Sequence, residues 1–345
     1  MKILYGVQTT GHGHLVRARQ MAPGLRDLGH QLHAMLSGPP PDPAWTAGLF
    51  ERFDYHPGFT FQIAAGRIRY LQTGRRLYLR RFLTDVRSFD AAGFDLVISD
   101  FEPLSAYIAK IHGIPSIGLG HLYAFCYRVP TGGFNPLAGL LWRYFAPVRH
   151  PLGFHWHHFD QPLLPPAISR DVRSAETFRP DKILLYLPFE NQGVITRWLA
   201  DFPDYQFYLY TDVAQASDHG HLHFRPFSRA GFLRDLGECA GVISHAGFTL
   251  TSEALHLGKK VLVRPLKGQF EQAANTAALL RLGLGSLISR LDEETLSDWL
   301  ERPPISPLVF PDVTPHVVRW IDAGNWDRIG ELAEGLWAVM KRNPV

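Results

Sequence analysis

Short apolar runs alternate with predicted helices along this chain, and this alternation constrains the fold more than any other feature. The first forty residues contain an apolar run at Ile3–Val7, a glycine-rich turn, a predicted helix over Leu15–Leu28 and a second apolar run at Gln31–Leu36. A strand, a helix and a strand in this order form a crossover between parallel strands. We therefore expect an open parallel sheet at the N-terminus.

The same alternation fills the rest of the chain and restarts after a proline-rich segment at 162–166. We expect strands at 96–100, 115–119, 182–187, 206–210, 241–244 and 260–263, and helices at 103–112, 191–201, 229–237, 250–257 and 270–282. A chain of 345 residues exceeds the size that one hydrophobic core usually reaches. The pattern predicts an α/β protein with two Rossmann-like, doubly wound domains that face a central cleft.

The expected domains cover residues 1–165 and 166–313, with the linker at 162–166. We expect residues 314–345 to form a helical segment that packs back on the first domain. Ligands of doubly wound sheets bind at the carboxyl ends of the strands. Side chains that follow a predicted strand are therefore the first candidates for a site.

The composition limits which kinds of partner and which cellular compartment are expected for this protein. A net charge of +3 gives no general support for nucleic-acid binding, so we expect no nucleic-acid partner. Cys126 and Cys239 lie far apart in the sequence, which fits a reducing compartment, and we expect a cytoplasmic protein. We expect no signal peptide, because the N-terminus lacks a long apolar segment, and no transmembrane helix, because no run of about 18 apolar residues occurs.

The most informative stretch is SHAGFTLTSEALHLGKKVLVRPLKGQFEQAANTAAL. His245 follows a predicted strand, Gly247 allows close backbone approach, and a helix is expected to begin near Thr249 and Thr251. The free N–H groups of a helix N-terminus, together with hydroxyls, form an anion site. Glu253 lies inside this helix, where a carboxylate suits a ribose diol.

Glu271 and Gln272 follow the next predicted strand and add hydrogen-bonding groups at the mouth of the same cleft. Groups for a phosphate, a ribose and a sugar in this order describe a nucleotide-sugar site. The alternative interpretation is an ordinary strand, loop and helix with incidental polar residues.

This segment resembles the C-terminal donor site of GT-B nucleotide-sugar glycosyltransferases, most of all the MurG-type family and the wider UDP-glycosyltransferases. The family motif falls on His245, Gly247, Glu253, Gly258, Glu271 and Gln272, with Asn275 trailing. The sequence departs from the motif at Leu250, a position that is often serine or threonine, and at Lys260, which replaces a proline.

The resemblance implies a role for each motif residue. His245 and neighbouring amides would bind the diphosphate, Glu253 the ribose, and Glu271 and Gln272 the donor sugar. The loop that contains Phe227 would lie near the nucleobase. The family typically needs no bound metal, so we expect no metal and no cofactor besides the nucleotide diphosphate sugar as co-substrate.

The stretch TTGHGHLVR after the first strand is the second candidate region. Gly13 and His14 match a glycine turn that faces the donor from the opposite domain in the same family. Arg17 lies one helical turn beyond, and we expect Gly13 and Arg17 to contact the donor. A histidine is suited to removing a proton from an attacking hydroxyl. His12 offers the same chemistry, and a purely structural role for His14 is the alternative.

Asp100 ends a predicted strand and is the expected partner of His14, which it would orient as in a His–Asp pair. Glu102, two residues later, is an alternative partner. Asp100 is also suited to capping the helix that follows it.

Two further segments suggest partners. Residues 67–87 carry seven arginines among tyrosine and leucine, which suits either an anionic membrane surface at the inner face of the membrane or a solvated helix paired with acids. Residues 121–148 are unusually aromatic and would line an acceptor pocket or fill core. The histidines at 155–158 lack the spacing of a metal site and are expected to form a loop.

These features predict an inverting glycosyltransferase of the hexosyltransferase type. It would move a sugar from a UDP-linked donor to a hydroxyl of an apolar or lipid-like acceptor, with His14 as the base. A MurG-like nucleotide-sugar hydrolase that activates water with the same histidine is the first alternative. A non-catalytic sugar-nucleotide-binding partner is the second.

Overall fold

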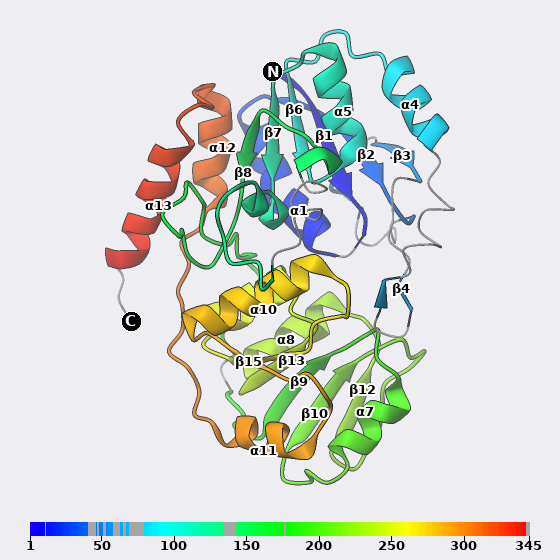
Figure 1. Cartoon of the computed structure of the whole chain (residues 1–345), viewed down its shortest axis with the longest axis vertical. Coiled ribbons are helices and arrows are strands. Elements are labelled where there is room, and N and C mark those ends of the chain that lie inside the picture. The colour runs from blue at the N-terminus through cyan, green and yellow to red at the C-terminus, as the bar shows by residue number, and fades with distance from the viewer. Residues whose placement is uncertain are drawn as a thin grey trace.

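The computed structural model describes residues 1–10, 12–40, 46, 48–50, 53–57, 63–64, 67–68, 79–133, 143–175 and 177–342. Two parallel sheets lie one above the other along the long axis of the molecule (Figure 1). Helix α10 (Phe270–Leu282) lies at the boundary between them. One cavity between the sheets is lined by residues of both halves.

The first sheet has the strand order β3-β2-β1-β6-β7-β8, and its neighbouring strands are parallel. Its strands are β1 (Lys2–Gln8), β2 (Gln31–Ser37), β3 (Phe53–His56), β6 (Leu96–Asp100), β7 (Ser116–Leu119) and β8 (His150–Leu152). Its helices are α1 (His12–Asp27), α4 (Leu79–Ser88), α5 (Pro103–His112) and the 3₁₀ helix η1 (His121–Cys126). Two short strands, β4 (Ile63–Ala64) and β5 (Arg67–Ile68), pair separately.

The second sheet has the order β11-β12-β10-β9-β13-β14-β15, and β11 is its antiparallel edge. Its strands are β9 (Lys182–Tyr186), β10 (Gln206–Tyr210), β11 (Ser217–His219), β12 (Leu222–Arg225), β13 (Gly241–Ser244), β14 (Lys260–Val263) and β15 (Ser286–Leu287). Its helices are α7 (Gln192–Leu199), α8 (Arg229–Glu238), α9 (Phe248–His256), α10 and α11 (Glu293–Glu301). In both sheets the strand order reverses beside the first strand, at β1–β6 and at β9–β13, where ligands of such sheets bind.

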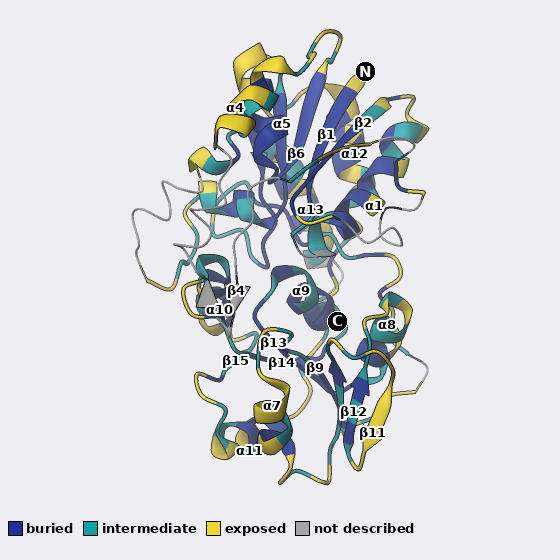
Figure 2. Ribbon diagram, turned by 90° about the vertical axis from the view of Figure 1, so that its right-hand side faces the viewer, coloured by how far each residue is buried: buried dark blue, intermediate teal, exposed yellow. Residues whose placement is uncertain are grey.

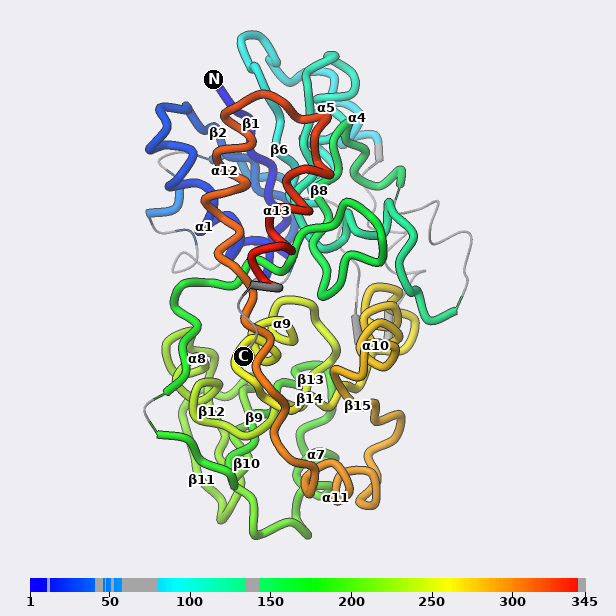
Figure 3. Tube along the Cα trace, turned by 90° about the vertical axis from the view of Figure 1, so that its left-hand side faces the viewer, coloured from blue at the N-terminus to red at the C-terminus, as the bar shows by residue number. Residues whose placement is uncertain are grey.

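The end of the chain returns to the first sheet (Figure 3). Helix α12 (Thr314–Ala323) packs on α1, and α13 (Ile329–Arg342) follows it. Trp337 in α13 donates its indole N–H to the carbonyl oxygen of Leu163 at 2.7 Å. The C-terminal helices therefore lie against the N-terminal half, as the sequence interpretation expects.

The central strands are buried on both faces, as the ribbon coloured by exposure shows (Figure 2). Parallel strands covered by helices on both sides need apolar side chains in both directions. The run Leu96–Ile98 and the run Ile183–Leu185 meet this need, with side chains that are almost completely buried. This explains why continuous apolar runs, and not alternating ones, identify these strands.

The predicted strands and helices all occur, and the largest shift is at α1, which begins at His12 and not at Leu15. The sequence interpretation missed β3, β4, β5, β8, β11, β12, β15, η1 and α11, and it gave no bounds for α4 or for the C-terminal helices α12 and α13. The missed strands are two to four residues long, too short to give a periodic signal.

The predicted linker at 162–166 is partly wrong. Leu163 and Leu164 are fully buried, and Leu164 exchanges backbone hydrogen bonds with Gly153 and His155 at 2.9 and 2.8 Å. This part of the segment packs with the first half because its two leucines are buried against apolar side chains there. The chain crosses to the second half after it, between residues 165 and 181.

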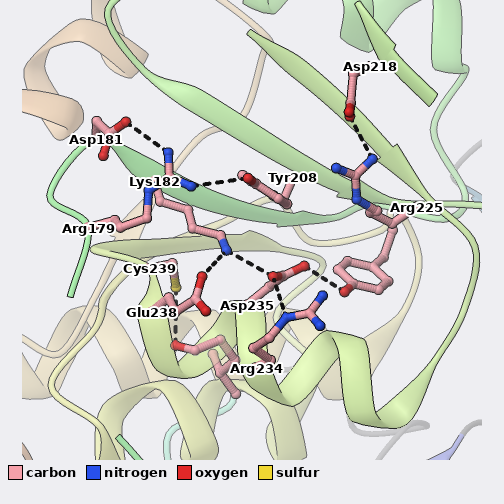
Figure 4. Close-up of polar contacts among 12 residues, drawn as sticks. Arg179, Asp181, Lys182, Tyr208, Asp218, Arg225, Arg234, Asp235, Glu238 and Cys239 are labelled. Atoms are coloured by element: carbon pink, nitrogen blue, oxygen red, sulfur yellow. Dashed lines mark hydrogen bonds and ion pairs between the residues drawn. The ribbon is translucent and has the colours of Figure 1, made fainter. Parts of the chain in front are cut away.

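A buried cation lies at the amino end of the second sheet (Figure 4). Lys182 Nζ lies 2.8 Å from Asp235 Oδ1 and 2.5 Å from Glu238 Oε2, and 3.9 Å from the centre of the Tyr208 ring. Tyr210 donates its hydroxyl to Asp235 Oδ2 at 2.7 Å. Because an unpaired buried ammonium costs several kcal/mol, these partners are needed for the packing of α8 on β9.

We predict that Asp235→Ala lowers the free energy of unfolding by about 1–3 kcal/mol, because it removes one of the two carboxylates that balance the buried ammonium and leaves the Tyr210 hydroxyl without its acceptor. Urea unfolding measures this. Asp218→Ala is the matched control: Asp218 also pairs with an arginine, Arg225, at 2.7 Å, but its side chain is 59% exposed. The control should lose less than about 1 kcal/mol. Equal losses in the two variants would contradict the assignment.

Candidate active site

The cavity between the two sheets has a volume of about 1600 Å³. The N-terminal half contributes the start of α1 and the residues after β6 and β7. The C-terminal half contributes the residues after β9, β12 and β13 and the first turn of α10. The cavity thus lies at the carboxyl ends of both sheets, where side chains from distant parts of the chain converge.

His14, Arg17 and Asp100 form one hydrogen-bonded group at the N-terminal wall. Asp100 ends β6, and its neighbour across the sheet is Val7 in β1, so the start of α1 lies beside it. His14 Nδ1 lies 2.6 Å from Asp100 Oδ1. Arg17 donates to both carboxylate oxygens of Asp100, from Nε at 2.8 Å and from Nη2 at 2.5 Å. This is the pairing of His14 with Asp100 that the sequence predicts.

The carboxylate fixes the tautomer of His14. An ionised carboxylate only accepts hydrogen bonds, so Nδ1 of His14 carries the hydrogen and Nε2 of the neutral ring does not. Burial alone would raise the pKa of Asp100, but Arg17 and His14 outweigh burial and hold this pKa below its usual range. The imidazole of His14 is therefore held in place by a fully buried, ionised carboxylate.

Glu102, the alternative partner of His14, is engaged elsewhere. It is fully buried and caps α5, accepting from the backbone N–H groups of Leu104 and Ser105 at 2.7 and 2.6 Å. Ser37 donates its hydroxyl to the same carboxylate at 2.6 Å. The interpretation of Asp100 as the helix cap is therefore wrong, and Glu102 does not reach His14. The side chain of His12 lies outside the described residues.

The backbone is strained on both sides of the cavity. Phe101, directly after Asp100, has a φ of 51°, and Ala246, directly after His245, has a φ of 60°. Left-handed conformations at residues other than glycine cost about 1–3 kcal/mol and gather at functional sites. One turn redirects the chain directly after Asp100, which bonds to His14, and the other directly after His245, which lines the cavity.

His245 lies at the C-terminal wall, after β13, and is 5% exposed. Its Nδ1 donates to the carbonyl oxygen of Arg264 at 2.8 Å. Its Nε2 is buried and has no hydrogen-bond partner among the residues that the structure describes. Burial lowers the pKa of His245. A neutral imidazole therefore presents an unsatisfied nitrogen beside the start of α9.

Helix α9 begins at Phe248 with Gly247 as its N-cap. Glycine has no side chain to satisfy the first N–H groups of the helix, which leaves them available to a ligand. Thr249 lines the cavity, but Thr251 is fully buried and is not among the lining residues. The prediction for Thr251 is wrong because the helix begins earlier than expected, which turns this residue away from the cavity.

Gly13 is the point of closest approach between α1 and α9. A Cβ atom at Gly13 would lie 2.6 Å from Thr249 Oγ1, so a larger residue would push the two halves apart. The sequence interpretation places Gly13 in a turn that faces the donor; the structure places it in the first turn of α1, beside Thr249 of the opposite half.

Glu253 is almost fully buried at the cavity wall, and Arg229 Nη2 lies 3.1 Å from its Oε1. Burial raises the pKa of Glu253, and Arg229 opposes this. Phe227 also lines the cavity and is 49% exposed, with its ring 5.6 Å from that of Tyr186. An acid and an exposed aromatic ring are thus found on the same side of the cavity.

Glu271 and Gln272 line the cavity from the first turn of α10. The side chain of Gln272 accepts a hydrogen bond from the backbone N–H of Leu266 at 2.8 Å, which holds the preceding loop. Every predicted site residue except Thr251 therefore lines this cavity or, like Asp100, bonds to a residue that does.

Two residues at the site escaped the sequence interpretation. His121 in η1 donates from Nδ1 to the carbonyl oxygen of Phe154 at 2.8 Å, and its Nε2 lies 2.6 Å from Asn275 Oδ1 on α10. Its ring stacks on Phe248 at 3.8 Å, so it joins the two halves. A histidine directly after a strand is the signal that also identifies His245, and it applies to His121. Arg229 carries no comparable signal.

The aromatic segment 121–148 is divided between cavity and core. Leu122 lines the cavity, together with Phe101, whereas Tyr123 and Ala146 are buried in a small core beneath them. Residues 134–142 lie outside the described residues. The core interpretation thus applies to Tyr123 and Ala146, whereas Leu122 lines the cavity and its part in an acceptor pocket stays a prediction.

A metal site and a membrane-spanning helix each require a particular arrangement of side chains, which can be checked in the described residues. No three His, Cys, Asp or Glu side chains gather there as a metal site would require. No helix of that part of the chain is both long and apolar enough to cross a membrane.

Comparisons with known proteins agree with this geometry. The family model described as glycosyl transferase family 1 matches residues 1–127 and 156–304. A search of curated proteins found no match.

Solved structures show the same fold. The glycotransferase of kitacinnamycin has a TM-score of 0.59 at 14% identity, with 99% of each chain covered. LpCGTa in complex with UDP has a TM-score of 0.58 at 16% identity, with 99% of each chain covered. The glycosyltransferase VinC in complex with DTDP has a TM-score of 0.54 at 16% identity and covers 99% of this chain and 100% of that chain. The two-domain architecture is that of GT-B glycosyltransferases.

Proposed function

Because the chain belongs to glycosyl transferase family 1 and is a glycosyltransferase with the GT-B fold, we propose that it transfers a sugar from a UDP-linked donor to an acceptor hydroxyl with inversion of the anomeric carbon. One observation carries this proposal: His14, held by Asp100, lines the same cavity as His245 and Glu253 from the opposite half. A base and a diphosphate site on opposite walls suit a single displacement. UDP and DTDP in two structural neighbours support the class of donor.

In the proposed reaction, the acceptor hydroxyl loses its proton to Nε2 of His14 while its oxygen bonds to the anomeric carbon. The bond from that carbon to the diphosphate breaks, and the diphosphate leaves with the electron pair. The transition state resembles that of glycoside hydrolysis. Because Arg17 already balances the charge of Asp100, the main task of Asp100 is to orient the imidazole.

The leaving diphosphate would lie at the start of α9, where free N–H groups and the helix dipole stabilise negative charge. His245 would contact it through Nε2. A phosphate oxygen only accepts hydrogen bonds, and Nδ1 already donates to Arg264, so His245 would act there as an imidazolium. Phe227 would stack on the base, and Glu271 and Gln272 would bind the sugar.

We propose an apolar or lipid-like acceptor, because Phe101 and Leu122 line the cavity on the same wall as His14. The exposed face of α4, with Arg80, Leu83 and Arg87, would contact an anionic membrane surface. The arginines at 69, 75 and 76 lie outside the described residues.

We predict that His14→Ala lowers turnover by about 10²–10⁴, because the proton acceptor is lost. Donor affinity should stay the same, since the other half binds the donor. Asp100→Asn should lose less, and the double variant should not lose the product of both factors, because the two residues act as a unit. Turnover with a panel of nucleotide diphosphate sugars and apolar alcohols, together with calorimetric donor affinity, measures these effects.

His33→Gln is the control, because His33 also pairs with an aspartate but is half-exposed and outside the cavity. Full transfer activity in His14→Ala would place the base elsewhere. Rapid release of free sugar that no acceptor accelerates would favour the hydrolase.

We predict that Glu253→Ala weakens UDP binding by about 1.5–3 kcal/mol, the contribution of a hydrogen bond to a charged group. The loss should be smaller for 2′-deoxy-UDP, which lacks one hydroxyl of the ribose diol. Isothermal calorimetry measures both affinities. Glu294→Ala, which removes an exposed acid on α11, serves as control. Unchanged affinity for UDP in Glu253→Ala would refute the ribose contact.

We predict that the protein sediments with vesicles of anionic lipid at low salt and not with vesicles of neutral lipid. Reversing two charges on α4, Arg80→Glu with Arg87→Glu, should abolish sedimentation. Reversing Arg197 on α7, which is exposed on the other half, should not. Sedimentation that is independent of lipid charge and of salt would disprove the electrostatic contact.

A further inference from the structure

Glu253 is a carboxylate in an environment that disfavours its charge. Its side chain is 3% exposed, and it lies inside α9 at the cavity wall. Burial raises its pKa, and the carboxylate of Asp171 raises it further. A protonated Glu253 would use one oxygen as an O–H donor and keep less capacity to accept, whereas a ribose diol needs an acceptor for two hydroxyl hydrogens.

Arg229 is the one cation that the structure places against this carboxylate among the described residues. It is the first residue of α8, and Ser228 caps that helix by accepting from the backbone N–H of Gly231. Nη2 of Arg229 lies 3.1 Å from Oε1 of Glu253, and the arginine side chain is 26% exposed. Two elements separated by β13 thus meet in one ion pair at the cavity wall.

The two carboxylate oxygens of Glu253 differ in their contacts. Oε1 faces Arg229, and no hydrogen bond joins Oε2 to another described residue. A guanidinium beside a buried carboxylate favours its ionised form. The remaining lone pairs of that form are all acceptors, which is what a vicinal diol requires.

We propose that Arg229 is a positioning residue of the donor site, which keeps Glu253 ionised and fixes Oε1 so that Oε2 receives the ribose hydroxyls. This inference rests on the proposed function, because it takes the ligand of Glu253 to be a ribose. It adds a second residue, from a separate helix, on which recognition of the nucleotide depends.

The test is the ratio of the affinities for UDP and 2′,3′-dideoxy-UDP, measured by calorimetry between pH 5 and pH 8. The ratio isolates the ribose contact, since titration of the diphosphate and of His245 affects both ligands equally. In the wild type the ratio should be at least about tenfold at high pH and should decline as the pH falls and Glu253 becomes protonated. If another nucleotide binds more tightly, it and its dideoxy analogue replace UDP.

In Arg229→Gln the affinity ratio should begin to fall at a higher pH than in the wild type, because removing the guanidinium raises the pKa of Glu253 further. Arg229→Lys, which keeps the charge, should return the midpoint toward that of the wild type. In Glu253→Gln the ratio should be low at every pH, and adding Arg229→Gln to it should cause no further loss. Arg197→Gln, a change of an exposed arginine on α7, should leave the curve unchanged.

A second measurement needs no ligand. Because the pKa of Glu253 is raised in the folded state, its ionisation reduces stability as the pH rises, and this effect is absent from Glu253→Gln. Arg229→Gln should make the loss of unfolding free energy between pH 4 and pH 8 larger than in the wild type. An unchanged loss, or an unchanged midpoint of the ratio, overturns the role of Arg229. A ratio of one at every pH in the wild type instead overturns the ribose contact and with it the proposed donor site.

Discussion

The carboxylate of Asp100 is buried completely at the end of β6, and its charge organises the N-terminal wall of the cavity. A buried carboxylate requires compensation, which Arg17 supplies through two hydrogen bonds to its two oxygens. His14, one helical turn before Arg17, then meets the same carboxylate through Nδ1. Gly120 leaves room for the pair, because a Cβ atom there would lie 2.9 Å from Arg17 Nη2. The position of the imidazole therefore follows from the need to bury one charge.

Much of this arrangement follows from the sequence. Continuous apolar runs identify the central strands, and a histidine or an acid directly after such a run lies at the carboxyl edge of a sheet. This reasoning locates His14, Asp100 and His245, and the motif spacing locates Glu253 and Glu271 in the same cavity. The same reasoning fails where the local sequence pattern does not decide the position of a side chain. Thr251 is buried away from the cavity because α9 begins two residues earlier than expected. Leu163 and Leu164 of the expected linker are instead buried in the first half.

Two contacts of the site were beyond prediction from one sequence, because no motif or strand end links their partners. Arg229 and Glu253 lie on different helices, and their pairing follows from the packing of α8 beside α9. His121 and Asn275 are separated by 154 positions and meet only when both sheets are in place. The contact of His121 with Asn275 joins the two walls of the cavity, so the site depends on how the halves are held together as well as on the residues in each.

The proposed mechanism requires that His14 and the diphosphate site lie on opposite sides of the reacting carbon. The most direct test is proton NMR of the sugar formed from an α-linked nucleotide diphosphate sugar, recorded before the anomers equilibrate. Transfer to an alcohol, or slow transfer to water, should give the β-anomer in the first product, because the base delivers the acceptor oxygen from the face opposite the diphosphate. An α-linked first product would show retention and contradict a single displacement assisted by His14.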